Sequence, residues 1–275
     1  MSASEQKASS IPVETVRTGD FSMRYFRFGR GKRPLVILPG LSVQSVMGSA
    51  DAVAGAYDLM AEDFTVTVFD RREELPGNYS VRDMAEDTAR AMKELGIADA
   101  CLFGASQGGM IAMLLAAHHP ELVSRLALGS TAARVDGSRA GALDTWLRLA
   151  ESGDAAGLYL AFGEAVYPEA VFAQLRELLI EMAKSVTAEE LARFSRLARG
   201  TMGFDAAERL GDISCPVLLL NSADDGVLGT DGADDIIRIL GDRPDFTVHT
   251  YTGYGHAAYD TAPDYKERLY RFFTA

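Results

Sequence analysis

The chain has 275 residues, 48% of them hydrophobic, and 27 Lys and Arg against 39 Asp and Glu give it a net charge of −12. This length and composition can bury one large core, so we expect one compact domain that carries an inserted subdomain. The acidic balance argues against nucleic acid and anionic membranes as partners, because lysine and arginine in excess bind both.

The first ten residues are polar and lack the apolar run of a signal peptide. No stretch of the chain reaches the roughly 18 apolar residues that a membrane span needs. We therefore expect a disordered N-terminal tail over residues 1–12 and a cytoplasmic protein. Cys101 and Cys215 each lie at or beside a predicted buried strand, which favours free thiols in the core over a disulfide.

Beyond residue 20, strand-like and helix-like patterns alternate, which is typical of a doubly wound, mainly parallel sheet with helices on both faces. In chain order, we expect strands over 22–28, 34–38 and 64–69, a strand that ends at residue 106, and then strands over 123–128, 216–220 and 246–251. The expected helices cover 52–62, 81–95, 110–118, 233–240 and 263–273.

Between residues 132 and 210 the strand-like runs vanish. Leucine, phenylalanine, tyrosine, tryptophan and methionine recur there at helical spacings instead. The strand pattern resumes at residue 216, so this segment is predicted to be a helical insertion that interrupts one sheet domain.

The stretch Gly104-Ala105-Ser106-Gln107-Gly108 joins an apolar strand to a helix-like run. A serine on such a sharp turn is forced outward, because small residues on either side let the strand and helix backbones approach each other. This pattern indicates a nucleophile elbow with Ser106 as an activated nucleophile.

A serine nucleophile needs a base, and the chain has four histidines. His118 and His119 end a predicted helix, where the partial negative charge favours them, and His249 lies inside a predicted strand. His256 follows Gly255 in a loop between the last strand and the last helix. Ligands bind at the carboxyl edge of doubly wound sheets, where this loop is expected, so His256 is the predicted general base.

The base in turn needs a carboxylate that orients the imidazole. Asp224 and Asp225 follow a predicted strand after a short turn, and we prefer Asp225, with Asp224 holding the turn. Residues 129–131, at the end of another strand, contain no acid. Asp70 precedes Arg71 and is expected to make a structural ion pair or turn contact.

Backbone N–H groups are needed to bind the oxyanion that forms during attack. The best candidates are the amides of Gln107, which follows the nucleophile, and Leu41. Leu41 comes after Pro39-Gly40 at the carboxyl end of a predicted strand, where glycine allows the sharp bend that turns the next amide inward.

Together, Pro39-Gly40-Leu41, the stretch around Ser106, Asp225 and Gly255-His256 closely resemble the α/β-hydrolase superfamily in residues and in chain order. The resemblance spans residues 20–275. It implies a hydrolase core over 13–131 and 211–275 and an all-helical cap over 132–210.

By the same resemblance, Ser106 would be the nucleophile, His256 the base and Asp225 the orienting acid. Leu41 and Gln107 would then line the oxyanion hole. The chain departs from the family at Pro39-Gly40, where most members carry His-Gly. It also lacks the His-Gly-Gly-Pro-Gly stretch of proline iminopeptidases and the nucleophilic aspartate of haloalkane dehalogenases and epoxide hydrolases.

The predicted function is that of a serine esterase that acts without a cofactor or metal on a small, largely apolar ester, thioester or lactone. Because fold and triad do not determine the substrate, aminopeptidase, carbon–carbon bond hydrolase and acyltransferase activities remain alternatives, as does a non-catalytic small-molecule receptor. An aminopeptidase would recruit carboxylates such as Glu151, Glu164 and Glu169 for the substrate ammonium. Monomer and homodimer both remain open.

Overall fold

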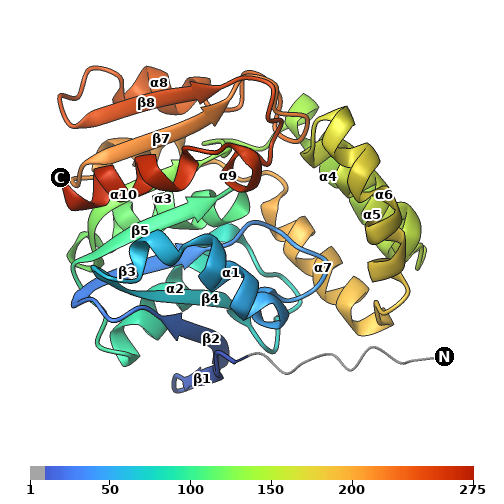
Figure 1. Cartoon of the computed structure of the whole chain (residues 1–275), viewed down its shortest axis with the longest axis horizontal. Coiled ribbons are helices and arrows are strands. Elements are labelled where there is room, and N and C mark those ends of the chain that lie inside the picture. The colour runs from blue at the N-terminus through green and yellow to red at the C-terminus, as the bar shows by residue number, and fades with distance from the viewer. Residues whose placement is uncertain (1–9) are drawn as a thin grey trace.

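The computed structural model describes residues 10–275, except for the side chains of residues 138 and 139, so residues 1–9 of the expected tail lie outside the described part. Eight strands form one sheet in the order β1-β2-β4-β3-β5-β6-β7-β8 (Figure 1). The strands are β1 Val13–Arg17, β2 Ser22–Phe28, β3 Arg33–Leu38, β4 Phe64–Arg72, β5 Ala100–Ala105, β6 Val123–Gly129, β7 Val217–Ser222 and β8 Phe246–Tyr251.

All neighbouring strands from β4 to β8 pair in parallel, whereas β1 and β2 add an antiparallel edge. The prediction of a mainly parallel, doubly wound sheet is therefore confirmed. The helices that flank it are α1 Ala50–Ala56, α2 Val81–Glu94, α3 Gln107–His118, α8 Asp234–Leu240, α9 Ala258–Thr261 and α10 Tyr265–Thr274. Helices α2, α3 and α8 pack on one face and α1 and α10 on the other, each over a hydrophobic core.

The helix predicted over 52–62 is wrong in its extent. α1 ends at Ala56, and a separate 3-10 turn covers Asp58–Met60. Gly55, a poor helix former in the last turn of α1, contributes to this early end. The structure also adds β1, which lies at the sheet edge and buries only Val16.

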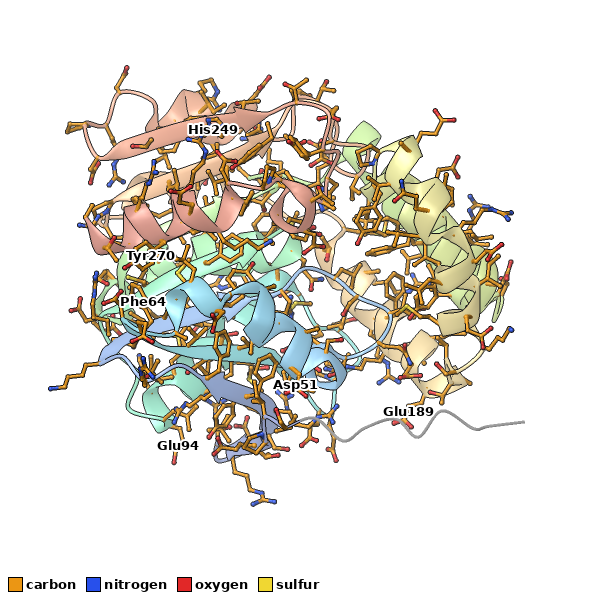
Figure 2. The ribbon with its side chains drawn as sticks, in the orientation of Figure 1. Asp51, Phe64, Glu94, Glu189, His249 and Tyr270 are labelled. Carbon is orange, nitrogen blue, oxygen red and sulfur yellow. The ribbon has the colours of Figure 1, made fainter. Side chains whose placement is uncertain are left out.

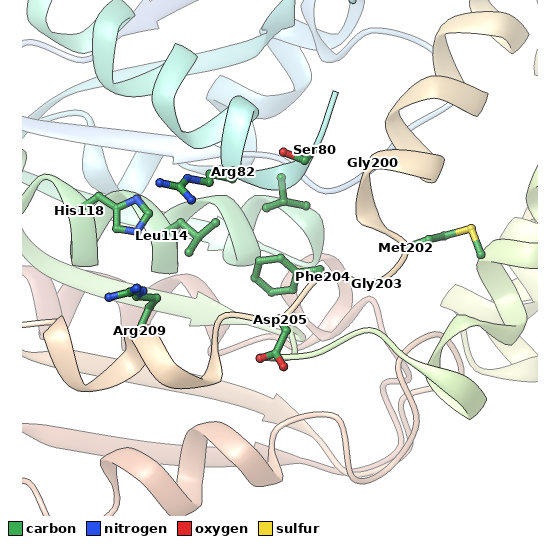
Figure 3. A pocket seen from close by; sticks show the side chains of 11 residues that line it. Ser80, Arg82, Leu114, His118, Gly200, Met202, Gly203, Phe204, Asp205 and Arg209 are labelled. Atoms are coloured by element: carbon green, nitrogen blue, oxygen red, sulfur yellow. The ribbon is translucent and has the colours of Figure 1, made fainter. Parts of the chain in front are cut away.

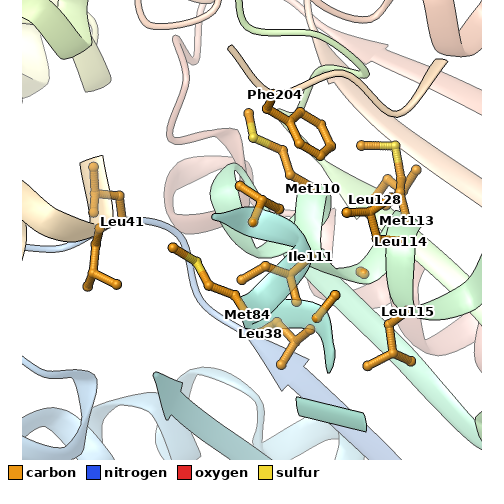
Figure 4. Packing of buried hydrophobic residues seen from close by; sticks show 14 of the residues in the cluster. Leu38, Leu41, Met84, Met110, Ile111, Met113, Leu114, Leu115, Leu128 and Phe204 are labelled. Atoms are coloured by element: carbon orange, nitrogen blue, oxygen red, sulfur yellow. The ribbon is translucent and has the colours of Figure 1, made fainter. Parts of the chain in front are cut away.

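Helix α2 begins at the predicted capping box: Ser80 Oγ accepts from the Asp83 N–H, and the Asp83 carboxylate accepts from the Ser80 N–H. Thr88 lies among the apolar residues of its buried face and donates its hydroxyl to the Met84 carbonyl at 2.7 Å, which satisfies that polar group inside the core. Met84 packs there with α3 and the strand ends (Figure 4).

Four helices separate β6 from β7 in sequence: α4 Gly141–Glu151, α5 Ala155–Val166, α6 Glu169–Ala183 and α7 Ala188–Thr201. We call these four the inserted helices. They stand beyond the end of the sheet toward which the parallel strands point (Figure 1). Within residues 10–275, no helix combines the length and the apolarity needed to cross a membrane.

Candidate active site

Ser106 lies on a strained turn between β5 and α3. Its φ of 53° and ψ of −122° are rare for a residue with a side chain, and such strain gathers at functional sites. Two glycines make the turn possible. A Cβ on Gly104 would lie 2.3 Å from the Gly108 carbonyl oxygen, and one on Gly108 would lie 1.9 Å from the Leu38 carbonyl oxygen. The turn around Ser106 therefore depends on both glycines.

The segment after β3 packs directly against this turn. A Cβ built on Gly40 would lie 3.2 Å from Ser106 Cβ, so the Pro39-Gly40-Leu41 backbone passes beside the serine. The Gln107 amide is the first of α3 and has no acceptor within the helix. Of the two predicted oxyanion donors, Gln107 thus follows Ser106 directly, and Leu41 comes one residue after the glycine that passes beside the serine.

His256 and Asp225 form a buried pair beyond the ends of β7 and β8. His256 Nδ1 lies 2.7 Å from Asp225 Oδ2, and the two residues are 2% and 7% exposed. Asp225 Oδ1 also accepts from the Val227 and Leu228 amides at 2.8 and 2.9 Å. Burial opposes the carboxylate charge, but the imidazole and these two amides outweigh it and lower the pKa of Asp225.

Asp224 contacts the same loop in a different way. Its Oδ2 accepts from the Gly255 amide at 3.0 Å, and its Oδ1 accepts from the Ser222 hydroxyl at 3.2 Å. Gly255 has a φ of 61°, a conformation that favours glycine. Asp224 therefore holds the turn that carries His256, and Asp225 is the carboxylate that touches the imidazole.

The structure does not join Ser106 to His256, because no hydrogen bond connects Ser106 Oγ with the imidazole among the described residues. Such bonds are often long or absent in an enzyme without substrate and form in the substrate complex. Both residues lie at the carboxyl edge of the sheet, with β6 and β7 between their strands.

The other three histidines lie away from this edge. His118 and His119, at the end of α3, each contact the Glu86 carboxylate, at 3.3 and 2.9 Å. His249 lies on the edge strand β8 (Figure 2), and its ring packs edge-on against Tyr251. None of them reaches the turn that carries Ser106.

The inserted helices contact the His256 loop. The Ala257 amide donates to the Val166 carbonyl at the end of α5, at 3.0 Å. A Cβ on Gly255 would lie 2.9 Å from the same oxygen, so the two backbones are in close contact. The insertion therefore packs against the segment that holds the imidazole.

Sequence reasoning missed a buried arginine. Arg71, at the end of β4, is 4% exposed, and its Nη2 donates to the Pro39 carbonyl at 2.7 Å and to Gln107 Oε1 at 2.9 Å. Burial lowers its pKa, and Asp70 opposes that effect. Asp70 itself accepts from the Ser45 hydroxyl at 2.5 Å, in keeping with its expected structural role. The pair Arg71-Arg72 after the predicted strand over 64–69 was the only sequence signal.

A separate cavity of about 260 Å³ opens toward the far end of α3, between α2 and the segment that follows α7 (Figure 3). Leu114 and His118 line it. They follow Ser106 by two to three helical turns, so this cavity is distinct from the surroundings of the serine.

Within the described residues, no group of three or more histidine, cysteine or acidic side chains could hold a metal ion. The two cysteines are buried free thiols, as predicted. Burial raises the pKa of both, that of Cys215 to about 11.

The glutamates considered for an aminopeptidase do not form a buried acidic site. Glu151 pairs with Arg199, and Glu164 and Glu169 are exposed on α5 and α6. The described carboxylates of this group therefore offer no enclosed place for a substrate ammonium.

Comparison with known proteins agrees with this architecture. A protein of Caulobacter vibrioides named "Putative carbamate hydrolase RutD" is 27% identical over 255 residues, which cover 88% of this chain and 90% of that protein. The solved structure of MGS-M2, an alpha/beta hydrolase enzyme from a deep-sea metagenome library of the Medee basin, matches with a TM-score of 0.84 at 20% identity, over 95% of this chain and 98% of the other.

A further structural match is the enol-lactonase from Burkholderia xenovorans LB400, with a TM-score of 0.80 at 17% identity, over 95% of this chain and all of the other. At these identities the two solved structures support the fold alone. The family model of the alpha/beta hydrolase fold matches residues 33–263, which is most of the chain. The chain therefore belongs to the α/β-hydrolase family.

Proposed function

We propose that this hydrolase cleaves a small, largely apolar carboxylic ester, thioester or lactone through an acyl-enzyme on Ser106. The observation that carries the proposal is the strained turn of Ser106, at the same sheet edge as a buried imidazole bonded to a carboxylate at 2.7 Å. A turn that costs this much conformational energy and places a serine beside free backbone amides is suited to nucleophilic attack.

In the first half of the reaction, Ser106 Oγ attacks the carbonyl carbon while His256 Nε2 takes the hydroxyl proton. The resulting oxyanion accepts from the Leu41 and Gln107 amides. The bond to the leaving oxygen or sulfur then breaks, and His256 returns its proton to the leaving group. Asp225 holds Nδ1 of the ring, which leaves Nε2 free for both transfers, and stabilises the imidazolium.

In the second half, His256 removes a proton from water, and the hydroxide attacks the acyl carbon. Collapse of this intermediate releases the carboxylic acid, and His256 gives its proton back to Ser106 Oγ. We assign the core to residues 13–131 and 211–275 and a cap to residues 132–210. Apolar side chains of the inserted helices, among them Trp146 and Phe162 with ring centres 4.5 Å apart, favour a neutral or apolar substrate.

A second candidate is carbamate hydrolysis, favoured by the relative named for that activity. The same residues would act on the carbamate carbonyl, since the chemistry at the carbon is the same acyl transfer. Comparing p-nitrophenyl butyrate with a p-nitrophenyl carbamate and an amino-acid p-nitroanilide separates the options. We expect the highest kcat/KM for the ester, and a preference for either of the others would reverse this order.

A fluorophosphonate probe tests the nucleophile directly. We expect the wild type to be labelled on the peptide that contains Ser106 and the Ser106→Ala variant to be unlabelled. Ser130→Ala is a matched control, because Ser130 directly follows the neighbouring strand β6, is buried and also has a positive φ, of 40°. Its labelling should equal that of the wild type, and labelling that persists in Ser106→Ala would refute the assignment.

A further inference from the structure

Arg71 connects the two segments that carry the proposed oxyanion donors. A single nitrogen, Nη2, donates to the Pro39 carbonyl at 2.7 Å and to Gln107 Oε1 at 2.9 Å. The amino group has two hydrogens, so it can serve both acceptors at once. One buried side chain thus links the end of β4 to the loop after β3 and to the first residue of α3.

The bond to Pro39 bears on the Leu41 amide. The Pro39 carbonyl belongs to the peptide plane that precedes Gly40, and an anchored carbonyl fixes the orientation of that plane. Only the φ and ψ of Gly40 then remain to set the direction of the next N–H. Since glycine allows many such combinations, an anchor on its N-terminal side narrows the positions of the Leu41 amide.

The bond to Gln107 continues into the inserted helices. Gln107 Nε2 donates to Thr201 Oγ1 at 2.7 Å and to the Leu197 carbonyl at 3.1 Å, both on α7. The three contacts of the Gln107 amide, with Arg71, Thr201 and Leu197, agree on one orientation, with its oxygen toward the guanidinium. Arg193, a turn before Leu197 on the same face of α7, donates to the Arg71 carbonyl at 3.0 Å.

The buried guanidinium of Arg71 is not explained by a contribution to stability alone. Both hydrogen-bond acceptors of the Arg71 guanidinium are neutral, the Asp70 charge acts on it without a side-chain hydrogen bond, and its Nε has no hydrogen-bond partner in the described structure. A buried charge with an unmet donor costs free energy that a hydrophobic side chain of the same volume would not. What the arginine supplies, and a hydrophobic residue would not, is a directed pair of bonds to the backbone and side chain beside Ser106.

We propose that Arg71 is a positioning residue that aligns the Leu41 and Gln107 amides with the oxyanion. Through Gln107 it links this alignment to the position of α7. The inference rests on the proposed function, because it concerns the transition state of that reaction. Arg71 touches neither donor amide directly and acts through Pro39 and Gln107.

The test compares Arg71→Met with the wild type on one p-nitrophenyl ester. Removing a whole oxyanion donor from a serine protease costs about 10²–10³ in kcat, so misaligned donors should cost about ten- to a hundredfold. We expect KM to stay within about threefold. The affinity for a trifluoromethyl ketone with the same acyl group should fall by the same factor as kcat, because such ketones form the tetrahedral oxyanion.

Two further variants keep the test valid if Arg71→Met folds poorly. Arg71→Lys retains a buried cation but lacks the planar guanidinium group. Its kcat and its affinity for the ketone should fall by the same factor as each other, and by less than in Arg71→Met. Arg71→Ala leaves space beside a cavity of about 340 Å³ that Arg71 lines, so low concentrations of guanidinium should restore part of kcat, whereas urea should not. A merely structural role would not produce rescue by the guanidinium ion.

Arg72→Met is the matched control. Arg72 is the next residue on β4 and pairs with Asp87 at 3.5 Å, but it bonds neither oxyanion segment, so its loss should change stability and leave kcat unchanged. Arg71 variants with unchanged kcat and ketone affinity, or an equal loss in Arg72→Met, would overturn the inference while Ser106 labelling still supports the function. A wild type that the fluorophosphonate does not label would overturn both.

Discussion

Two buried polar clusters lie on opposite sides of the strand that carries Ser106, and they are built differently. Toward β8, His256 faces Asp225, whose second oxygen accepts from two backbone amides. Toward β4, Arg71 donates to a carbonyl and an amide oxygen, and its Nε has no hydrogen-bond partner in the described structure. The first cluster can take up and release a proton, whereas the second carries a permanent charge and can only hold neighbouring groups in place.

The two clusters also meet the inserted helices differently. On the histidine side the contact is between backbones, from the Ala257 amide to the Val166 carbonyl. On the arginine side it passes through side chains, from Gln107 to Thr201 and Leu197. A single substitution can therefore weaken the link to α7 on the arginine side, while a substitution that keeps the N–H of residue 257 leaves the donor of the other bond in place.

The largest predicted effect tests whether the histidine cluster carries the chemistry. Asp225→Asn preserves the shape of the side chain but removes the charge that orients and stabilises the imidazole, so kcat should fall about 10⁴-fold. Asp224→Asn is its neighbour and control. It weakens an acceptor for the Gly255 amide, and its kcat should fall less than about fivefold. Ester hydrolysis under saturating substrate measures both.

A reversed order of these two losses would show that Asp224 orients the base in the working enzyme. Equal losses would mean that the loop acts as a unit and that the 2.7 Å contact of Asp225 has no special role. Circular dichroism of both variants guards against a loss that comes from unfolding.

The histidine cluster was largely predictable from the sequence, and the arginine cluster was not. Ser106, Asp225 and His256 each follow a recognisable strand, and their order along the chain matches a family pattern. Arg71 follows the predicted strand over 64–69 in the same way, but its partners are a backbone carbonyl and a glutamine amide. Any residue offers a carbonyl, so no residue type in the sequence marks such a partner.

The fold shows the same limit. The parallel strands were visible as continuous apolar runs, because both of their faces are buried. β1 was missed, since it buries only Val16 and shows no alternation of apolar and polar residues. The early end of α1 at Ala56 was missed, because one glycine in its last turn is a weak sequence signal.

The Tm as a function of pH measures what the charge of Asp225 contributes to stability. The lowered pKa of Asp225 means that its charge stabilises the fold above its ordinary pKa near 3.9, and this contribution is lost as the pH falls through the lower native value. The Tm of the wild type should therefore exceed that of Asp225→Asn by a steady few degrees between pH 7 and about 5. The gap should narrow below about pH 4.

Asp87→Asn is the control of opposite sign. Burial raises the pKa of Asp87, so protonation of this carboxylate favours the folded state. The Tm of the wild type should therefore rise relative to that of Asp87→Asn as the pH falls toward 4. If the two Tm differences from the wild type change in the same direction, the whole protein is being denatured by acid. The charge of Asp225 then makes no separate contribution to stability.

The smallest predicted effect tests the side-chain link between α7 and the site. Thr201→Val is nearly isosteric and removes one of the two acceptors of Gln107 Nε2. A lost hydrogen bond of about 1 kcal/mol corresponds to a two- to fivefold fall in kcat with KM unchanged. Ser195→Ala deletes a buried hydroxyl on the same helix that, among the described residues, bonds to the Leu191 carbonyl alone, so its kcat should stay at the wild-type value. Equal losses in the two variants would mean that α7 affects the site as a whole rather than through Gln107, and the contrast between the two clusters would then lie in their charges alone.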